Sequence, residues 1–299
     1  MAVGDVMLAR SIGDRILAGG PAVPFAGVAS TLAEADLLVV NLECAISERG
    51  EPQPKGYTFR APLAAADSLA LAGVDVVGLA NNHALDYGPE ALADTFQLLS
   101  ERGIAYTGAG SSQEAARAPA VIERNGLRLA FLGYVDVPVE SGGFDTRSWT
   151  AGLDSPGVAW AVPEHVAADV AAARALADVV IVLFHFGLES RAEVTDLQRA
   201  LAHAAIEAGA SLVIGSHPHV LQGVEQYGGG LIVYSLGNFV FDGFGFPENY
   251  SAIFTATLTR EGAQDFGWVP VVVENGLPRL ANSEEALAAL ALIRKLSEK

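Results

Sequence analysis

The chain has 299 residues, of which 51% are hydrophobic and 18% are charged, and this composition excludes a disordered, collagen-like or coiled-coil protein. Its 18 Lys and Arg residues against 35 Asp and Glu residues give a net charge of -17, so its surface would repel a phosphate backbone and we expect no nucleic-acid partner. A single cysteine, Cys44, excludes an internal disulfide framework and a cysteine-based zinc cluster.

Short apolar runs rich in Val, Leu and Ile alternate with amphipathic stretches along the chain. Such runs predict strands that are covered on both faces, and the pattern as a whole predicts a layered α/β sandwich with mixed sheets. The expected strands lie at 37–40, 74–79, 129–133, 179–184, 212–214, 231–234, 252–258 and 268–273. The expected helices lie at 62–72, 89–102, 163–175, 195–208 and 283–297, three of them beginning at a proline.

Turn signals and long irregular stretches complete this outline. Asn125-Gly126 and the glycines at 228–230 each separate two apolar runs, which predicts two hairpins. Residues 47–61 and 135–162 are rich in Pro or Gly and lack periodicity. Loops of this length inside a compact domain are often functional.

The beginning of the chain bears on its cellular location. The sequence contains neither an apolar run long enough to span a membrane nor a visible signal peptide. It opens at residues 1–4 within an expected strand, which leaves open an upstream signal or anchor that has been trimmed away. The absence of disulfides fits the cytosol and does not exclude the cell surface.

Polar residues that follow six of the expected strands are the most informative feature of the sequence. In open α/β sheets, ligands bind at the carboxyl ends of the strands. Four of the six histidines belong to this set, whereas His165 and His203 fall in expected helices. The set consists of Asp5, Asn41, Glu43, Asn81, Asn82, His83, His185, Ser216, His217, His219 and Asn238.

Taken singly, each of these residues has a simpler explanation. Asp5 and Glu43 suit turns, caps or a solvated surface, and His185 suits a buried histidine in the core. His217-Pro218-His219 is more specific, because a proline stiffens the turn between two potential ligands. Together the imidazoles and carboxylates suit zinc, manganese or iron, and a bridging carboxylate can hold two ions about 4 Å apart. The combination at one sheet edge therefore predicts a metal site.

These residues lie in motifs that resemble the CapA family, the capsule or poly-γ-glutamate synthesis proteins. The motifs follow the order of that family over about residues 1–242. They are GDVML at 4–8, NLE at 41–43, KGYTFR at 55–60, ANNH at 80–83, HFGLE at 185–189, GSHPH at 215–219 and YSLGNF at 234–239.

The resemblance implies a branch of the calcineurin-like metallophosphoesterases and a four-layer α/β/β/α sandwich of two mixed sheets. It implies one domain over residues 1–299, with a core over about 1–275 followed by the helix at 283–297. It also implies that Glu43 bridges two metal sites. Carried over by position, Asn82, His185 and His217 complete one site, Asp5 and His219 serve the other, and His83 is the general acid or contacts the transferred oxyanion.

Two positions depart from the phosphoesterase pattern. Met7 stands where that pattern has a histidine, and Glu43 stands where it has an aspartate. The metal site of Asp5 and His219 therefore loses an imidazole and is weakened or vacant. One or two divalent ions (Mn, Zn or Fe) are thus the expected cofactor. Met7 itself suits the core better than this hard ligand set.

Several further residues are candidates for supporting roles. Arg60 is expected to bind a carboxylate or phosphate of the substrate, with a surface arginine as the alternative. Asn41 is grouped with it as a substrate contact, and Glu189 either orients His185 or acts on water, with a capping carboxylate as its alternative. Asp86 and Asn238 are expected to hold ligand histidines or the turn that carries them.

Two functions follow from the resemblance. One is a metal-dependent hydrolase of a phosphoester or of an amide in an anionic capsule polymer. The other is a non-catalytic subunit that binds poly-γ-glutamate or assembles the membrane synthase, and in either case the family resemblance implies the cell envelope. Because the chain is acidic, an anionic polymer must be attracted locally, by bound cations and by Arg60, Lys55 and Arg10.

Overall fold

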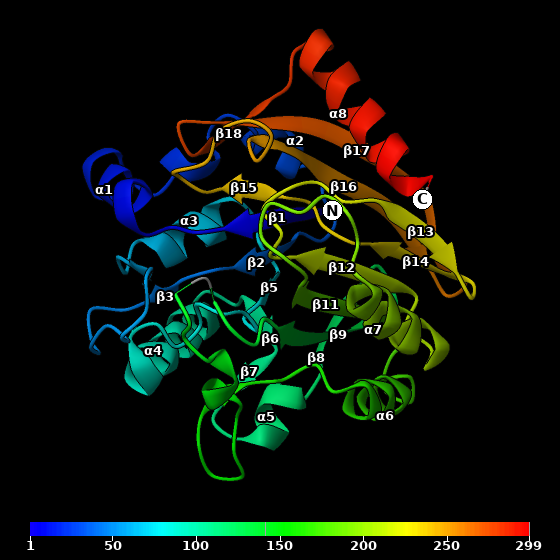
Figure 1. Cartoon of the computed structure of the whole chain (residues 1–299), viewed down its shortest axis with the longest axis horizontal. Helices are drawn as coiled ribbons and strands as arrows, with labels where there is room; N and C mark the ends of the chain where they lie inside the picture. Colours follow the sequence, from blue (N-terminus) through cyan, green and yellow to red (C-terminus); the bar gives the residue numbers. More distant parts are fainter. Residues whose placement is uncertain (141, 299) are drawn as a thin grey trace.

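Two mixed β-sheets pack face to face in the computed structural model, which describes residues 1–140 and 142–298 (Figure 1). The first sheet has the order β18-β17-β16-β1-β2-β5-β6, and β15 also pairs with β1. Its strands are β1 (Ala2–Val6), β2 (Val39–Leu42), β5 (Val76–Gly78), β6 (Ala105–Thr107), β15 (Asn238–Val240), β16 (Tyr250–Thr259), β17 (Gly262–Glu274) and β18 (Leu277–Leu280).

The second sheet has the order β13-β14-β12-β11-β9-β8. Its strands are β8 (Ala120–Arg124), β9 (Leu127–Asp136), β11 (Val179–Phe186), β12 (Leu212–Ser216), β13 (Val224–Tyr227) and β14 (Gly230–Val233). Two short ladders lie outside both sheets, β3 (Ala45–Ile46) with β4 (Arg60–Ala61) and β7 (Ala109–Gly110) with β10 (Gly157–Val158). In both sheets the central strands are parallel and antiparallel hairpins occupy an edge, which makes the sheets mixed as predicted.

The core between the sheets is built from the inward-facing side chains of their central strands. Val39 and Val76 of the first sheet lie in one buried cluster with Phe131, Ile181 and Val233 of the second. Successive residues of a strand face opposite sides, so the other half of each apolar run faces outward and needs a helix to cover it.

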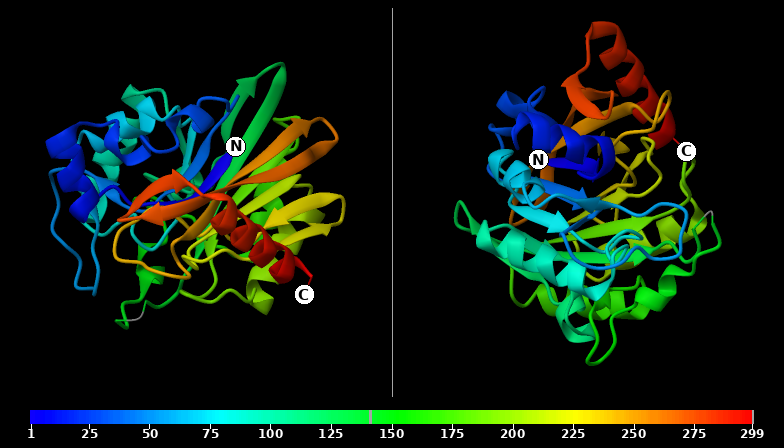
Figure 2. Two further views of the ribbon diagram at one scale, coloured as in Figure 1. Left: turned by 90° about the horizontal axis from the view of Figure 1, so that it is seen from above. Right: turned by 90° about the vertical axis from the view of Figure 1, so that its left-hand side faces the viewer.

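Helices provide that cover on both outer faces (Figure 2). The helices α1 (Arg10–Gly19), α3 (Ala65–Leu71) and α4 (Gly88–Glu101) pack on the first sheet, while α6 (Pro163–Ala173) and α7 (Asp196–Glu207) pack on the second. The order of layers is therefore α/β/β/α, which confirms the expected four-layer sandwich. The remaining helices are α2 (Ala29–Leu32), α5 (Gln113–Arg117), α8 (Ser283–Ser297) and short 3-10 turns at Val23–Phe25 and Thr146–Trp149.

Most predicted elements are present, and the differences lie at their ends. Both predicted hairpins occur, β8–β9 around Asn125-Gly126 and β13–β14 around Gly228-Gly229, and α8 has the predicted bounds. The helix α1 was not predicted, because its sequence mixes Gly, Asp and Arg with only two buried isoleucines, Ile12 and Ile16. Within residues 1–140 and 142–298, none of the helices is long and apolar enough to cross a bilayer.

Five residues of the predicted set lie inside strands and not beyond them: Asp5, Asn41, His185, Ser216 and Asn238. Asp5 pairs with Asn41 of β2 and Asn238 of β15, and His185 pairs with Ser216 of β12. The strands β1 and β11 run past their apolar stretches because neighbouring strands on both sides continue the backbone ladder.

Candidate metal centre

The six residues predicted as metal ligands converge where the two sheets meet at the carboxyl ends of their parallel strands. Asp5 comes from β1, Glu43 follows β2, Asn82 follows β5, His185 lies in β11, and His217 and His219 follow β12. All six are buried, and Asp5 and Glu43 have no exposed surface at all. Residues from five strands can meet here because parallel strands end at the same edge.

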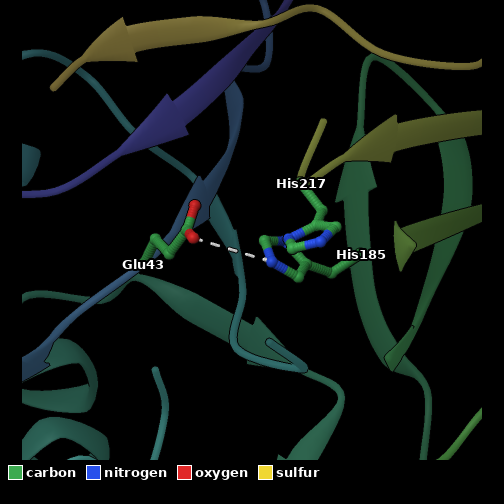
Figure 3. Close-up of side chains that lie close together, drawn as sticks. All are labelled: Glu43, His185 and His217. Carbon is green, nitrogen blue, oxygen red and sulfur yellow. Dashed lines mark ion pairs between the residues drawn. The ribbon is translucent and has the colours of Figure 1, made fainter. Parts of the chain in front are cut away.

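One ligand group consists of Glu43, His185 and His217, whose ligand atoms lie within 4.8 Å of one another (Figure 3). His185 Nε2 lies 3.6 Å from Glu43 Oε1 and 2.7 Å from Asn82 Oδ1. Ligands around a tetrahedral ion with bonds of about 2.1 Å are about 3.4 Å apart, so the separation of the carboxylate from the imidazole suits a shared cation.

A second group consists of Asp5, Glu43 and His219 and shares Glu43 with the first. His219 Nδ1 lies 3.3 Å from Asp5 Oδ2, and its Nε2 lies 3.9 Å from Glu43 Oε1. The grouping agrees with the one that the resemblance implies, with Glu43 between two ligand sets. Whether each residue binds metal remains a prediction.

The turn that carries His217 and His219 has an unusual backbone. Their φ angles are 96° and 59°, in the left-handed region that bulky side chains rarely adopt. Surrounding contacts hold this conformation: Asp5 Oδ2 accepts a hydrogen bond from the His217 amide, and the Asn238 side chain bonds both the ring and the carbonyl of His219. Strained residues of this kind gather at functional sites, and here the strain aims two imidazoles into one cluster.

Hydrogen bonding and burial prepare His185 as a neutral ligand. His185 Nδ1 lies 2.9 Å from the Ser216 hydroxyl, which donates to the carbonyl of Phe184 at 3.2 Å and can accept a proton from Nδ1. His185 Nε2 lies 2.7 Å from Asn82 Oδ1, an acceptor, so without an ion Nε2 donates to that oxygen, and an ion bound between the two atoms would require the proton on Nδ1. Burial, together with the neighbouring imidazoles, holds the pKa of His185 and that of His217 well below the usual range. Neutral imidazole is the form that binds metal.

Unsatisfied buried atoms show that the cluster fits a cation. Among the described residues, the buried atoms Glu43 Oε1 and His217 Nδ1 have no hydrogen-bond partner. Burial and then the adjacent Asp5 carboxylate raise the pKa of Glu43 well above its usual range. An ion bound between the carboxylates and imidazoles would satisfy both atoms and offset the repulsion between the two acids.

His83 stands beside this cluster with an orienting partner. Its Nδ1 lies 2.7 Å from Asp86 Oδ2, its Nε2 lies 3.9 Å from Glu43 Oε1, and its ring stacks on Phe59 with centroids 4.1 Å apart. Burial lowers the pKa of His83, against the opposing effect of Asp86. The ring is thus fixed with one nitrogen on a carboxylate and the other facing the ligands.

Met7 belongs to the core, as the sequence indicated, and Cys44 is buried in the core as well. Met7 is fully buried, and its sulfur accepts a hydrogen bond from the backbone amide of Ala9 at 3.1 Å. Burial raises the pKa of the Cys44 thiol to about 12, so this side chain is no nucleophile.

Two predicted substrate contacts, Asn41 and Glu189, differ in their surroundings. Asn41 lies between the carboxylates, with Nδ2 2.8 Å from Asp5 Oδ1 and 3.3 Å from Glu43 Oε2. Glu189 is exposed, and its carboxylate forms a possible ligand group with the buried imidazoles of His217 and His219. Their roles toward a substrate remain predictions.

The three cations expected to attract a polymer are all engaged within the protein. Arg60 donates to the carbonyls of Arg49 and Gly50 at 3.1 Å and lies over the ring of Tyr87. Arg10 pairs with Asp242. The Lys55 side chain has no exposed surface, and its ammonium pairs with the carboxylates of Asp86 and Glu140. The attraction of a polymer by these three cations remains a prediction.

Sequence reasoning missed one residue of this neighbourhood. Glu140, from the long irregular stretch at 135–162, accepts a hydrogen bond from Asn82 Nδ2 at 2.8 Å and pairs with Lys55. The unusual length of that loop was the only available signal, because its spacing from the strands carries no information about contact.

Comparison with known proteins places the chain in a family. The profile described as "Bacterial capsule synthesis protein PGA_cap" matches residues 1–243. The chain belongs to the PGA_cap family. The predicted resemblance to CapA proteins is thereby confirmed, and the matched range of the PGA_cap profile contains every candidate ligand.

Curated relatives of this PGA_cap chain include two proteins from Bacillus. The chain is 35% identical to "PGA biosynthesis protein CapA" of Bacillus subtilis (strain 168) over 224 residues, which cover 75% of the chain and 57% of that protein. It is 31% identical to "Capsule biosynthesis protein CapA" of Bacillus anthracis over 289 residues, which cover 94% of the chain and 69% of that protein. The chain thus spans little more than half the length of the first of these relatives.

A solved structure shares the fold. The PGA_cap chain superposes on a crystal structure described as a novel phosphatase from Mycoplasma pneumoniae with a TM-score of 0.58, over 98% of this chain and 97% of the other. Sequence identity is 16%, so the likeness concerns the fold alone. It confirms the expected phosphoesterase-like arrangement of two mixed sheets.

Proposed function

We propose that this chain is a metal-dependent hydrolase that cleaves a phosphoester, or an amide of an anionic capsule polymer, at the cell envelope. One observation carries the proposal: His83 is held by Asp86 at Nδ1 while its Nε2 faces Glu43 across 3.9 Å. A protein that only bound or assembled a polymer would gain nothing from a buried imidazole fixed beside the ligand set. The substrate classes come from the family resemblance and from the names of the relatives.

The proposed chemistry divides between the ligands and His83. A divalent ion (Mn, Zn or Fe) held by Glu43, Asn82, His185 and His217, with a second beside Asp5 and His219, would activate water and stabilise negative charge on the reacting group. In its protonated form, which burial disfavours and Asp86 favours, His83 would donate its Nε2 proton to the leaving group, while Asp86 keeps the ring in place. Burial of the cluster excludes bulk water and strengthens these electrostatic contacts.

The second candidate is a non-catalytic subunit that binds poly-γ-glutamate or joins membrane synthase subunits. Met7 favours it, because a buried methionine occupies the position where the phosphoesterase pattern has a metal-binding histidine. In this second candidate, the metal ion binds carboxylates of the polymer. The candidate predicts that polymer binding is lost when a chelator removes the ion.

Metal analysis combined with turnover tests the proposal. The purified chain is assayed for bound metal, then for hydrolysis of a generic phosphodiester and of poly-γ-glutamate with added Mn²⁺ or Zn²⁺. We expect metal-dependent turnover that His217→Ala abolishes together with metal binding, and that His83→Ala lowers while metal binding persists.

The matched control is His165→Ala, because His165 lies in α6, away from the cluster. Stoichiometric metal without turnover, with polymer binding that chelation abolishes, supports the second candidate. Turnover that survives His83→Ala at the full rate would remove the proposed acid and leave the metal site standing.

A further inference from the structure

Lys55 is a buried cation in the loop at 47–61. Its side chain has no exposed surface, and its Nζ lies 2.8 Å from Asp86 Oδ1 and also pairs with Glu140. The rings of Trp149 and Phe144 lie 4.9 and 5.8 Å from the ammonium. A buried ammonium is stable only when it is paired with acids, so the two carboxylates fix the position of Lys55 Nζ.

The partners of Lys55 are the residues that hold the candidate machinery. Asp86 uses its other oxygen, Oδ2, to bind His83 Nδ1 at 2.7 Å. Lys55 Nζ also donates to the backbone carbonyl of Asn82, between the two carboxylates. One ammonium thus links the orienting acid of His83 to the backbone of the neighbouring ligand.

Glu140 determines which way the amide of Asn82 faces. A carboxylate oxygen only accepts hydrogen bonds, so the 2.8 Å contact with Glu140 Oε1 requires the NH2 group of Asn82 on that side. The carbonyl oxygen Oδ1 is therefore turned toward His185 Nε2, at 2.7 Å. With the amide reversed, the NH2 group, whose nitrogen lone pair is delocalised into the carbonyl and binds no metal, would face the proposed ion.

We infer that Lys55 and Glu140 form a clamp that positions Asn82 as an oxygen ligand and His83 beside it, a role that rests on the proposed metal-dependent function. Lys55 belongs to the loop at 47–61 and Glu140 to the loop at 135–162, so the two long irregular stretches of the chain meet in this buried pair. Both are positioning residues, since each acts through Asn82 or Asp86.

Metal binding by Glu140→Gln tests the clamp. This variant keeps the Lys55–Asp86 pair but offers an amide that can present either its oxygen or its NH2 group to Asn82. Metal-stripped protein is titrated with Mn²⁺ in a calorimeter, and the visible absorption of bound Co²⁺ reports the coordination geometry. We expect a 10- to 100-fold loss of Mn²⁺ affinity, the usual effect of altering a group that orients a ligand, and an altered Co²⁺ spectrum.

The control is Asp169→Asn, which removes the negative charge of another partly buried carboxylate. Asp169 pairs with Arg117 and accepts a hydrogen bond from Tyr134, and it contacts none of the candidate ligands. This control variant should leave Mn²⁺ affinity and the Co²⁺ spectrum unchanged. The double variant Lys55→Met/Glu140→Gln removes the whole pair without adding net charge and should show a loss at least as large. Melting temperatures measured in parallel separate a loss of affinity from a loss of folded protein.

The possible outcomes separate the clamp from the proposed function. If the wild-type chain binds Mn²⁺ and a folded Glu140→Gln variant binds it equally well with the same Co²⁺ spectrum, the clamp is overturned and the hydrolase proposal is untouched. If the wild type binds no metal, both are overturned. If metal binding falls as expected but no substrate is turned over, the clamp stands and the hydrolase proposal fails.

Discussion

His83 Nδ1 lies 2.7 Å from Asp86 Oδ2, and both side chains are buried beside the ligand set. The pair gives the imidazole one orientation, with Nε2 toward Glu43. Asp86 also accepts a hydrogen bond from the Phe59 amide at 2.6 Å, so the orienting acid is itself anchored to the loop whose aromatic ring covers His83.

We expect Asp86→Asn to lower turnover by about 10²- to 10⁴-fold, the usual contribution of a positioned acid or base. The double variant with His83→Ala should be no slower than His83→Ala alone, because two groups that act as a unit do not contribute additively. Turnover of the two single variants and the double variant on one substrate is the measurement. Effects that multiply would show that Asp86 acts independently of His83.

Metal removal should destabilise the protein. An ion that binds only the folded chain adds about 2.7 kcal/mol to the free energy of unfolding at a concentration 100 times its dissociation constant. Chelation should therefore lower the melting temperature, and added Mn²⁺ or Zn²⁺ should restore it. His217→Ala is the control, because its melting temperature should no longer respond. Equal melting of the wild type with and without chelator would contradict a specific site.

Only the buried face of the C-terminal helix α8 should contribute to the stability of the protein. Ile293 is 5% exposed in a cluster with Leu221 and Ala252, whereas Leu287 on the same helix is 72% exposed. We expect Ile293→Ala to lower the free energy of unfolding by about 2–5 kcal/mol, and Leu287→Ala to change it by less than about 0.5 kcal/mol. Urea denaturation of both variants measures the difference, and equal effects would mean that α8 does not dock as described.

The stability that the first turn of α8 contributes should fall at acidic pH. Hydrogen bonds from Arg279, and then from the Asn282 amide, lower the pKa of Glu285 to about 2 from its usual value of 4.5. A pKa that is depressed on folding contributes stability above the unfolded value, and that contribution is lost as the pH falls from about 4.5 toward 2. Glu285→Gln should reduce this loss, as seen in urea midpoints between pH 2 and 6. An unchanged pH profile would show that the pair adds nothing.

Cys44 should be unreactive in the folded protein. It is 1% exposed, and burial raises its pKa to about 12, so almost no thiolate is present near neutral pH. A disulfide reagent such as dithionitrobenzoate at pH 8 should label the unfolded chain quickly and the native chain only at its rate of unfolding. Rapid labelling under native conditions would contradict the described packing around β2.

The sequence was sufficient for the outline of the fold and for naming the candidate residues of the site. Apolar runs such as 179–184 and caps such as the one at Asn282 act locally, so strands, hairpins and α8 could be predicted from short windows. The polar residues of the edge could be named because parallel strands end together, which brings distant motifs such as the one at Glu43 and the one at His217 together. The choice of six of them as ligands came from the resemblance to the CapA family.

Contacts between loops depend on where the two sheets place them, and short windows carry no such information. The sequence predicts that Arg60 and Lys55 attract an anionic polymer, but it does not show that Arg60 stacks on Tyr87 or that Lys55 pairs with Asp86 and Glu140. The sequence by itself determined which chemical groups stand at the sheet edge. Only the tertiary structure decided which atoms face one another, because burial forces each charge and each polar atom to find its partner in space and not along the chain.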